Sequence, residues 1–122
     1  MSVKTILIVD DESIITHALS RALEKDPFKI MTAVDGKKGL QIILHHRPDL
    51  ILLDNLMPRL TGIEVLKKMK EAGLNIPVIL MTAYGDAATE KKAQTLGVSA
   101  YLTKPFQNIE DVLTLIRSKI KS

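Results

Sequence analysis

The 122-residue chain contains no cysteine. This absence excludes disulfides, thiolate metal sites and a cysteine nucleophile, and it suits a reducing cytosol, so we expect a cytoplasmic location. The chain also lacks a long hydrophobic run, because the first apolar stretch, "ILIV", is followed at once by acidic residues. That stretch is too short for a signal peptide or a membrane span, and we expect no contact with a membrane.

Aromatic residues are scarce, at 3% of the chain, and the net charge is only +3. The basic residues cluster in "KKMK", "EKK" and "RSKIKS", and no aromatic residue is interleaved with them. A surface that binds single-stranded nucleic acid would combine basic with aromatic side chains. We therefore interpret these clusters as solvated helix faces and expect no direct nucleic-acid contact. The glycine-rich patterns G-x-x-x-x-G-K-[ST] and G-x-G-x-x-G are also missing, which argues against tight nucleotide binding.

What the chain does contain is a regular alternation of short apolar runs with segments of helical period. The runs "TILIVD", "DLILLD" and "PVILMT" are apolar at successive positions, which is typical of strands covered on both faces in a parallel sheet. We predict strands over 5–10, 28–33, 49–54, 77–82 and 99–103, and helices over 13–25, 38–46, 62–73, 88–97 and 109–121. The prediction is one domain, residues 1–122, with a three-layer α/β/α flavodoxin-like (βα)5 fold and a parallel sheet of strand order 2-1-3-4-5.

Residues that begin and end helices agree with this alternation. Thr61 and Glu64 form a capping box at the start of the third helix. The other predicted boundary residues are the N-caps Asp35, Asp86 and Asn108, and the terminating glycines Gly73 and Gly97.

Polar residues collect where the predicted strands end. Asp10 and Asp11 close the first strand, Asp54 the third and Thr82 the fourth, while Lys104 follows the fifth. Parallel strands end at one edge of the sheet, and ligands bind there, so these side chains are expected to share a cleft. Two carboxylates ~4 Å apart repel by about 4 kcal/mol at an effective dielectric of ~20, and a cation would offset that cost. Carboxylates with a backbone carbonyl suit Mg²⁺, and Mg²⁺ beside a lysine suits a phosphoryl group.

From Lys4 to Ile120 the chain resembles the receiver domain of two-component response regulators, in the CheY-like superfamily. The resemblance is carried by "LIVDDE", "LILLDNLMPRLTG", "VILMTAYG" and "SAYLTKPF", which occur in the order and spacing of that family. It implies that the Asp54 carboxylate is the phosphoacceptor. It further implies that Mg²⁺, with Mn²⁺ as a substitute, is bound by Asp10 (largely through water), Asp11, Asp54 and the backbone carbonyl of Leu56.

The resemblance also assigns the switch. Thr82 and Lys104 would bind the phosphoryl group, Tyr101 would move after Thr82, and the Lys104–Pro105 bond would be cis. The donor would be a phosphohistidine on a sensor histidine kinase or a histidine phosphotransfer protein. Phosphorylation would change the face formed by the fourth helix, fifth strand and fifth helix, which would control an output domain, a partner or a homodimer. Such a protein assists its own phosphorylation and dephosphorylation without being a multiple-turnover enzyme, either as a stand-alone receiver or as the N-terminal receiver of a larger regulator.

Leu56 and Tyr84 occupy the two positions that tune the phosphoryl lifetime in this family. Both are bulky, and neither side chain is a carboxylate or amide that would orient water. We therefore expect slow self-dephosphorylation.

Several simpler interpretations stay open from the residues alone. Asp10 and Asp11 would also suit the N-terminus of a solvated helix. Tyr101 would serve equally as core packing, Met57 and Pro58 as residues that shape the loop, and His17, His45 and His46 as helix-surface residues. Two other functions compete: a dehalogenase-type phosphatase with Asp10 as nucleophile, and a degenerate receiver that only docks partners. Phosphate label on Asp54 with stoichiometric uptake would favour the switch, and label on Asp10 with multiple turnover would favour the phosphatase.

Overall fold

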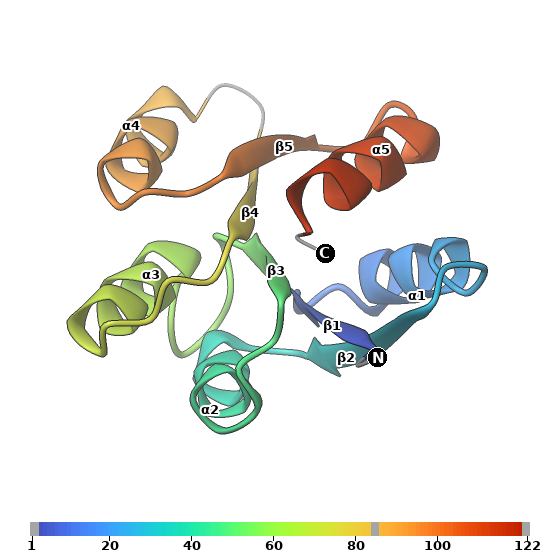
Figure 1. Cartoon of the computed structure of the whole chain (residues 1–122). Coiled ribbons are helices and arrows are strands. Elements are labelled where there is room, and N and C mark those ends of the chain that lie inside the picture. Colours follow the sequence, from blue (N-terminus) through green and yellow to red (C-terminus); the bar gives the residue numbers. More distant parts are fainter. Residues whose placement is uncertain (1–2, 84–85, 121–122) are drawn as a thin grey trace.

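The computed structural model describes residues 3–83 and 86–120, and in them five strands alternate with five helices. The elements are β1 (Lys4–Val9), α1 (Ser13–Ala22), β2 (Phe28–Ala33), α2 (Gly36–His46), β3 (Leu50–Asp54), α3 (Gly62–Glu71), β4 (Val78–Ala83), α4 (Ala87–Thr95), β5 (Ala100–Lys104) and α5 (Ile109–Lys119). The strands form one parallel sheet of order β2-β1-β3-β4-β5 (Figure 1). The predicted flavodoxin-like fold and strand order are therefore confirmed.

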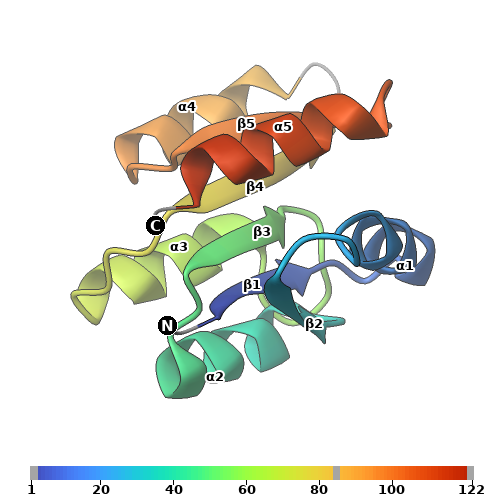
Figure 2. The same ribbon diagram turned by 45° about the vertical axis from the view of Figure 1, so that its right-hand side comes forward.

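Helices cover both faces of the sheet, as the apolar runs of its strands require. In Figures 1 and 2, α1 and α5 lie on one face, while α2, α3 and α4 lie on the other. Because side chains alternate along a strand, Ile6 and Ile8 pack with α1 and α5, whereas Leu7 and Val9 pack with the other three helices. Each face thus has its own apolar core, and strand β3 is buried at every position from Leu50 to Asp54.

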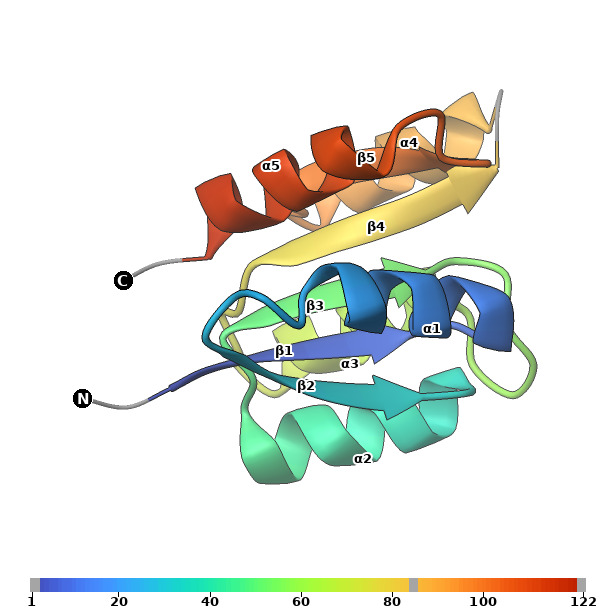
Figure 3. The ribbon, with the colours of Figure 1, turned by 90° about the vertical axis from the view of Figure 1, so that its right-hand side faces the viewer.

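The register of the sheet brings the carboxyl ends of the strands to one edge. Figure 3 shows the arrowheads of β1, β2 and β4 pointing the same way. Along that edge, Val9 pairs with Leu53, Asp54 with Met81 and Ala83 with Lys104. The polar residues that follow or close these strands therefore meet at a single place.

The helix starts follow the predicted capping residues. Thr61 Oγ1 accepts the Glu64 amide at 3.2 Å, and Glu64 Oε1 accepts the Thr61 amide at 2.9 Å, which completes the capping box of α3. The side chains of Asp35, Asp86 and Asn108 cap α2, α4 and α5. Gly73 and Gly97 follow α3 and α4 with φ of 73° and 82°, a conformation that glycine adopts without strain.

Several element boundaries differ from the prediction. Helix α1 ends at Ala22 instead of residue 25, because the chain turns there with Glu24 N–H donating to the Arg21 carbonyl. Helix α2 begins earlier than predicted, at Gly36, because Asp35 caps it by accepting the Lys38 amide. Helices α3 and α4 end two residues before the expected glycines, at Glu71 and Thr95. Within residues 3–83 and 86–120, none of the helices is long and apolar enough to cross a membrane.

Candidate functional site

Acidic side chains from two neighbouring strands meet at the carboxyl edge of the sheet. Asp10, Asp11, Glu12 and Asp54 each offer a carboxylate oxygen, and these oxygens all lie within 4.8 Å of one another. Asp10 is fully buried and Asp54 is 5% exposed, while Asp11 and Glu12 face solvent. The structure therefore brings together the three aspartates that the sequence singled out, and it adds Glu12.

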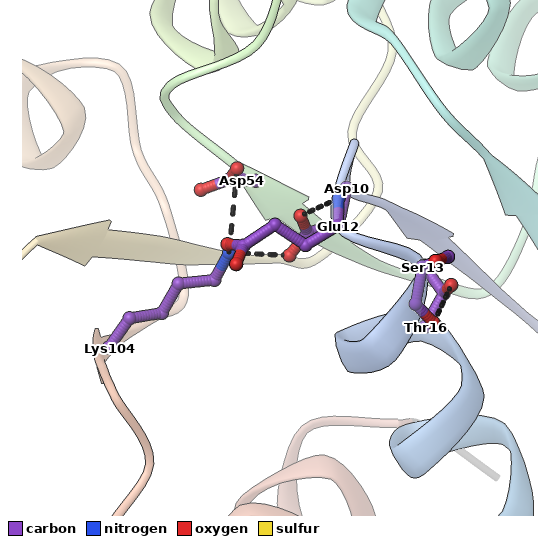
Figure 4. Close-up of polar contacts among 6 residues, drawn as sticks. All are labelled: Asp10, Glu12, Ser13, Thr16, Asp54 and Lys104. Atoms are coloured by element: carbon purple, nitrogen blue, oxygen red, sulfur yellow. Dashed lines mark hydrogen bonds and ion pairs between the residues drawn. The ribbon is translucent and has the colours of Figure 1, made fainter.

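Lys104 is the cation of this cluster. Its Nζ lies 2.6 Å from Asp10 Oδ2, 2.8 Å from Glu12 Oε1 and 3.5 Å from Asp54 Oδ2 (Figure 4). The Asp10 contact is an ion pair outside hydrogen-bond geometry, since Oδ2 has no aligned donor in the described chain. Burial alone would lower the pKa of Lys104, but its contacts with Asp10 and Glu12 outweigh burial and raise it. Lys104 is thus held as an ammonium, and the Lys104–Pro105 bond is cis, as the resemblance implied.

The pKa of the Asp54 carboxyl is raised from 3.8 to about 6. Burial is the largest cause, and the negative charges of Asp10 and Asp11 add to it, while Lys104 opposes them. At neutral pH the Asp54 carboxylate is ionised in surroundings that disfavour its charge. A further cation beside it would relieve that cost.

The donor set fits a hard divalent cation. The cluster consists of four carboxylates, and Lys104 is the cation that pairs with three of them. Oxygen donors of this kind suit Mg²⁺ or Mn²⁺ rather than a soft metal. The carboxylate oxygens of Asp10, Asp11, Glu12 and Asp54 could therefore hold such an ion together.

An open cleft of ≈ 380 Å³ leads to the Asp54 carboxylate. Its polar lining comes from Glu12, Asp54 and Lys104, and its apolar lining from Ile15, Leu56, Ala83 and Pro105. The Leu56 side chain, which the sequence placed among the lifetime-tuning residues, is 64% exposed at this cleft. The second residue of that pair, Tyr84, lies outside the described residues.

Thr82 and Tyr101 lie on the β4–β5 side of the site. Thr82 is 1% exposed, and its Oγ1 has no hydrogen-bond partner among the residues the structure describes. Leaving a buried hydroxyl without a hydrogen bond costs about 1–3 kcal/mol of folding free energy, so a hydrogen bond to this hydroxyl would be favourable. Tyr101 is half-buried against the core, and its hydroxyl donates to the Glu90 carbonyl of α4 at 2.8 Å. Tyr101 therefore connects β5 with α4, while Thr82 follows Met81, the residue of β4 that pairs with Asp54.

The alternative that Asp10 and Asp11 merely cap a helix is wrong. The N-cap of α1 is Glu12, and it makes no side-chain capping bond. Asp10 Oδ1 instead accepts the Glu12 amide at 2.9 Å, which fixes the turn between β1 and α1. The three histidines are exposed on α1 and α2, and Met57 is buried beside exposed Pro58 in the loop after β3.

Sequence reasoning missed roles for two residues. Glu12 was visible only as part of "DDE", and its bond to Lys104 joins positions 92 residues apart. Asn55 follows Asp54 and is 7% exposed, with its side chain bonded to the start of α3. The sequence did hold one signal for Asn55. Side chains alternate along a strand, so Asn55 is expected on the face of the sheet opposite Asp54.

Comparison with known proteins gives a consistent result over nearly the whole chain. A family model described as the response regulator receiver domain matches residues 6–117. Sporulation initiation phosphotransferase F of Bacillus subtilis is 38% identical over 112 residues, which cover 92% of this chain and 90% of that protein. The transcriptional regulatory protein DltR of Streptococcus agalactiae is 36% identical over 116 residues, or 95% of this chain. The chain spans about half, 51%, of the length of DltR.

Solved structures agree with the sequence relatives. The CheY-like response regulator receiver domain protein of Methanospirillum hungatei JF-1 superposes with a TM-score of 0.90 at 30% identity, covering 98% of this chain and 94% of that one. The Francisella response regulator 1452 receiver domain gives a TM-score of 0.88 at 29% identity, with 96% of both chains covered. On the family match, the fold and the relatives together, this chain belongs to the response regulator receiver domains of two-component regulatory systems.

Proposed function

We propose that this chain is a phosphorylation-activated switch whose Asp54 carboxylate accepts a phosphoryl group from a phosphohistidine. The donor is a sensor histidine kinase or a histidine phosphotransfer protein, and the setting is the cytoplasm. The observation that carries the proposal is the convergence of Asp54 with Asp10, Asp11 and Lys104 at an open cleft. A carboxylate exposed to a cleft, beside an ammonium and a cluster of acidic oxygens, is suited to attack phosphorus.

The transfer can be written from the residues of this chain. An Asp54 carboxylate oxygen attacks phosphorus as the bond from phosphorus to the donor's imidazole nitrogen breaks, and that nitrogen keeps the electron pair. Lys104, only 15% exposed, is placed to balance charge on the phosphoryl oxygens. The Thr82 hydroxyl, which has no partner among residues 3–83 and 86–120, is available to donate a hydrogen bond to one of them. Mg²⁺, held by Asp10, Asp11, Asp54 and the Leu56 carbonyl, would supply further charge neutralisation.

The rim of the cleft supports a protein donor over a small molecule. Ile15, Leu56 and Pro105 line it, and Ile14, one residue earlier in α1, is 81% exposed. Exposed apolar side chains that gather in one place often mark a surface that binds another protein. One relative is by name a phosphotransferase, which fits the transfer of a phosphoryl group.

The switch would be transmitted through the face formed by α4, β5 and α5. Strand β5 is at the edge of the sheet, and among the residues of α4 only Ala93 is buried. When the Thr82 hydroxyl turns toward a phosphoryl group, Tyr101 would follow and change its bond to the Glu90 carbonyl. That face would then change its preference for an output domain, a partner or a second copy. Hydrolysis of the acyl phosphate returns the switch to its starting state. This hydrolysis is slow, because the Leu56 side chain offers no group to orient water. The chain is therefore a switch that is phosphorylated once per cycle, not a multiple-turnover enzyme.

Intact-mass measurement after incubation with acetyl phosphate and Mg²⁺ tests the proposal. The wild type should gain one phosphoryl group, Asp54→Asn none, and the control Asp111→Asn, on the exposed surface of α5, as much as the wild type. Uptake by Asp54→Asn, with label on Asp10 and multiple turnover, would favour a phosphatase. No uptake by the wild type, even with a phosphorylated histidine kinase, would leave a docking module.

A further inference from the structure

We propose that Asn55 is a positioning residue for the divalent cation: its side chain fixes the main chain that presents the Leu56 carbonyl. The inference rests on the proposed function, because it concerns the cation that the proposed transfer needs. Asn55 is one of the few buried polar residues, at 7% exposure, and it directly follows the acceptor. Asp54 faces the cleft, and the alternation along β3 turns Asn55 toward the face that α3 covers.

Asn55 joins three elements through its own polar groups. Its N–H donates to the Met81 carbonyl of β4 at 3.1 Å, and its carbonyl accepts the Gly62 amide of α3 at 3.0 Å. Its side-chain Oδ1 accepts the Ile63 amide at 3.2 Å. The first two bonds use main-chain atoms that any residue would supply. The third requires an acceptor on the side chain, so it depends on the identity of residue 55.

The remaining amides at the start of α3 have partners of their own. The capping box satisfies Glu64 and Thr61, and the Asn55 carbonyl satisfies Gly62. The Ile63 amide is one of the free donors that every helix start presents, and the side chain of Asn55 is what binds it. Without that acceptor, one anchor between α3 and the end of β3 is lost while the capping box stays intact.

The start of α3 also lies in close contact with the end of strand β3. A Cβ at Gly62 would lie 2.8 Å from the Asp54 carbonyl oxygen and 2.9 Å from Asn55 Cα, so the backbones approach as closely as only glycine allows. Residues 56–61 form a loop whose two ends are held together by Asn55 and Gly62. A backbone carbonyl in such a loop cannot be re-aimed by a side-chain rotamer. These anchors therefore restrict the paths that the main chain of residues 56–61 can take, and the Leu56 carbonyl belongs to that main chain.

Residues that orient a metal ligand typically change metal affinity by about 10–100-fold when they are replaced. For Asn55→Ala we expect the apparent Kd for Mg²⁺, measured without phosphodonor by amide chemical shifts, to rise about tenfold. At saturating Mg²⁺ the maximal rate of phosphoryl uptake from acetyl phosphate should stay within about threefold of the wild type. A general loss of structure would instead lower uptake at every Mg²⁺ concentration.

Two further variants separate positioning from stability. Thr61→Ala removes the cap of the same helix without touching Asn55, and its Kd for Mg²⁺ should stay within about twofold of the wild type. Asn55→Asp keeps an acceptor in place, and because its charge can only attract the cation, its Kd should not rise. This variant also tests the proposal if Asn55→Ala does not fold.

The inference is overturned if Asn55→Ala binds Mg²⁺ as the wild type does, or if Thr61→Ala or Asn55→Asp weakens binding as much as Asn55→Ala. Failure of the proposed function would be seen elsewhere, in a wild type that neither binds Mg²⁺ nor takes up a phosphoryl group.

Discussion

Replacing Asp54 by its neutral amide should stabilise the metal-free protein at neutral pH. In the folded chain, burial and the charges of Asp10 and Asp11 raise the pKa of Asp54 from 3.8 to about 6. The ionised carboxylate is therefore worse accommodated in the folded state than in the unfolded chain. Asp54→Asn removes that charge and keeps the shape of the side chain.

The magnitude follows from the same pKa. One pKa unit corresponds to 1.36 kcal/mol, so a rise from 3.8 to about 6 is worth about 3 kcal/mol at most. The 3.5 Å attraction to Lys104 already lowers this pKa and is therefore included in the figure, but burying the polar amide of the variant takes back part of the gain. At pH 8 without metal, we expect the free energy of unfolding of Asp54→Asn to be about 2 kcal/mol higher than that of the wild type. For a domain of this size that is a rise in Tm of about 8 °C.

The pH dependence gives the sharper test. A carboxyl whose pKa is raised by folding contributes stability below its unfolded pKa of 3.8, and that contribution is lost as the pH rises through about 6. The advantage of Asp54→Asn should therefore be small near pH 4, grow up to about pH 6 and stay constant above it. Urea unfolding of both proteins in EDTA from pH 4 to pH 8 measures this, with the exposed Asp111→Asn as a control that should show no such gain. An advantage that is absent at pH 8, or equal at pH 4 and pH 8, would refute the assignment of Asp54 to a buried, like-charged site.

Three further predictions follow from other contacts. Mg²⁺ should raise the Tm of the wild type at pH 8, because a ligand that binds the folded state stabilises that state. The difference in Tm between the wild type and Asp54→Asn should therefore become smaller. Thermal melts in which Mg²⁺ leaves this difference unchanged would contradict the metal site. Arg59 has φ of 75°, so Arg59→Gly should raise the free energy of unfolding by about 1 kcal/mol in urea. The exposed ion pair between Arg59 and Asp35, at 3.5 Å, contributes little to stability, so its loss should not offset this gain. If Arg59→Gly is less stable than the wild type, the backbone of Arg59 is not strained. Tyr101→Phe should cost about 1 kcal/mol and speed amide exchange in α4, since it loses the bond to Glu90; unchanged exchange would show that this bond does not hold the helix.

Most of the fold could be predicted because its strongest signals are local. The apolar runs of β1, β3 and β4 are buried on both faces, which is the environment that such runs indicate. Helix ends were less accurate, because Leu23 packs in the core just beyond the last residue of α1, so the apolar pattern still indicates a helix where the chain already turns. Helix α4 was predicted from a helical period, its place in the alternation and its capping residue Asp86; the structure confirms the helix and its cap, although its amphipathic pattern is weak.

The site was predicted as far as strand ends determine it. Asp10, Asp54 and Lys104 follow from the rule that parallel strands end at one edge, and the structure places them within contact of one another. The bond of Glu12 to Lys104 depends on where two distant loops lie, which no local pattern encodes. Asn55 looked like an ordinary polar residue after a strand, and only the close approach of α3 gives its amide a partner.

Helix α4 buries little of its surface, and this affects how such a domain can be altered. Because Ala93 is the single buried residue of that helix, most of its positions can change without disturbing either core. Under the proposed function, the acceptor chemistry would lie at the strand ends and recognition of the output partner on the solvent side of α4, in separable parts of one small protein. Engineers who wish to redirect the signal can randomise the solvent side of α4 and leave every group around Asp54 untouched.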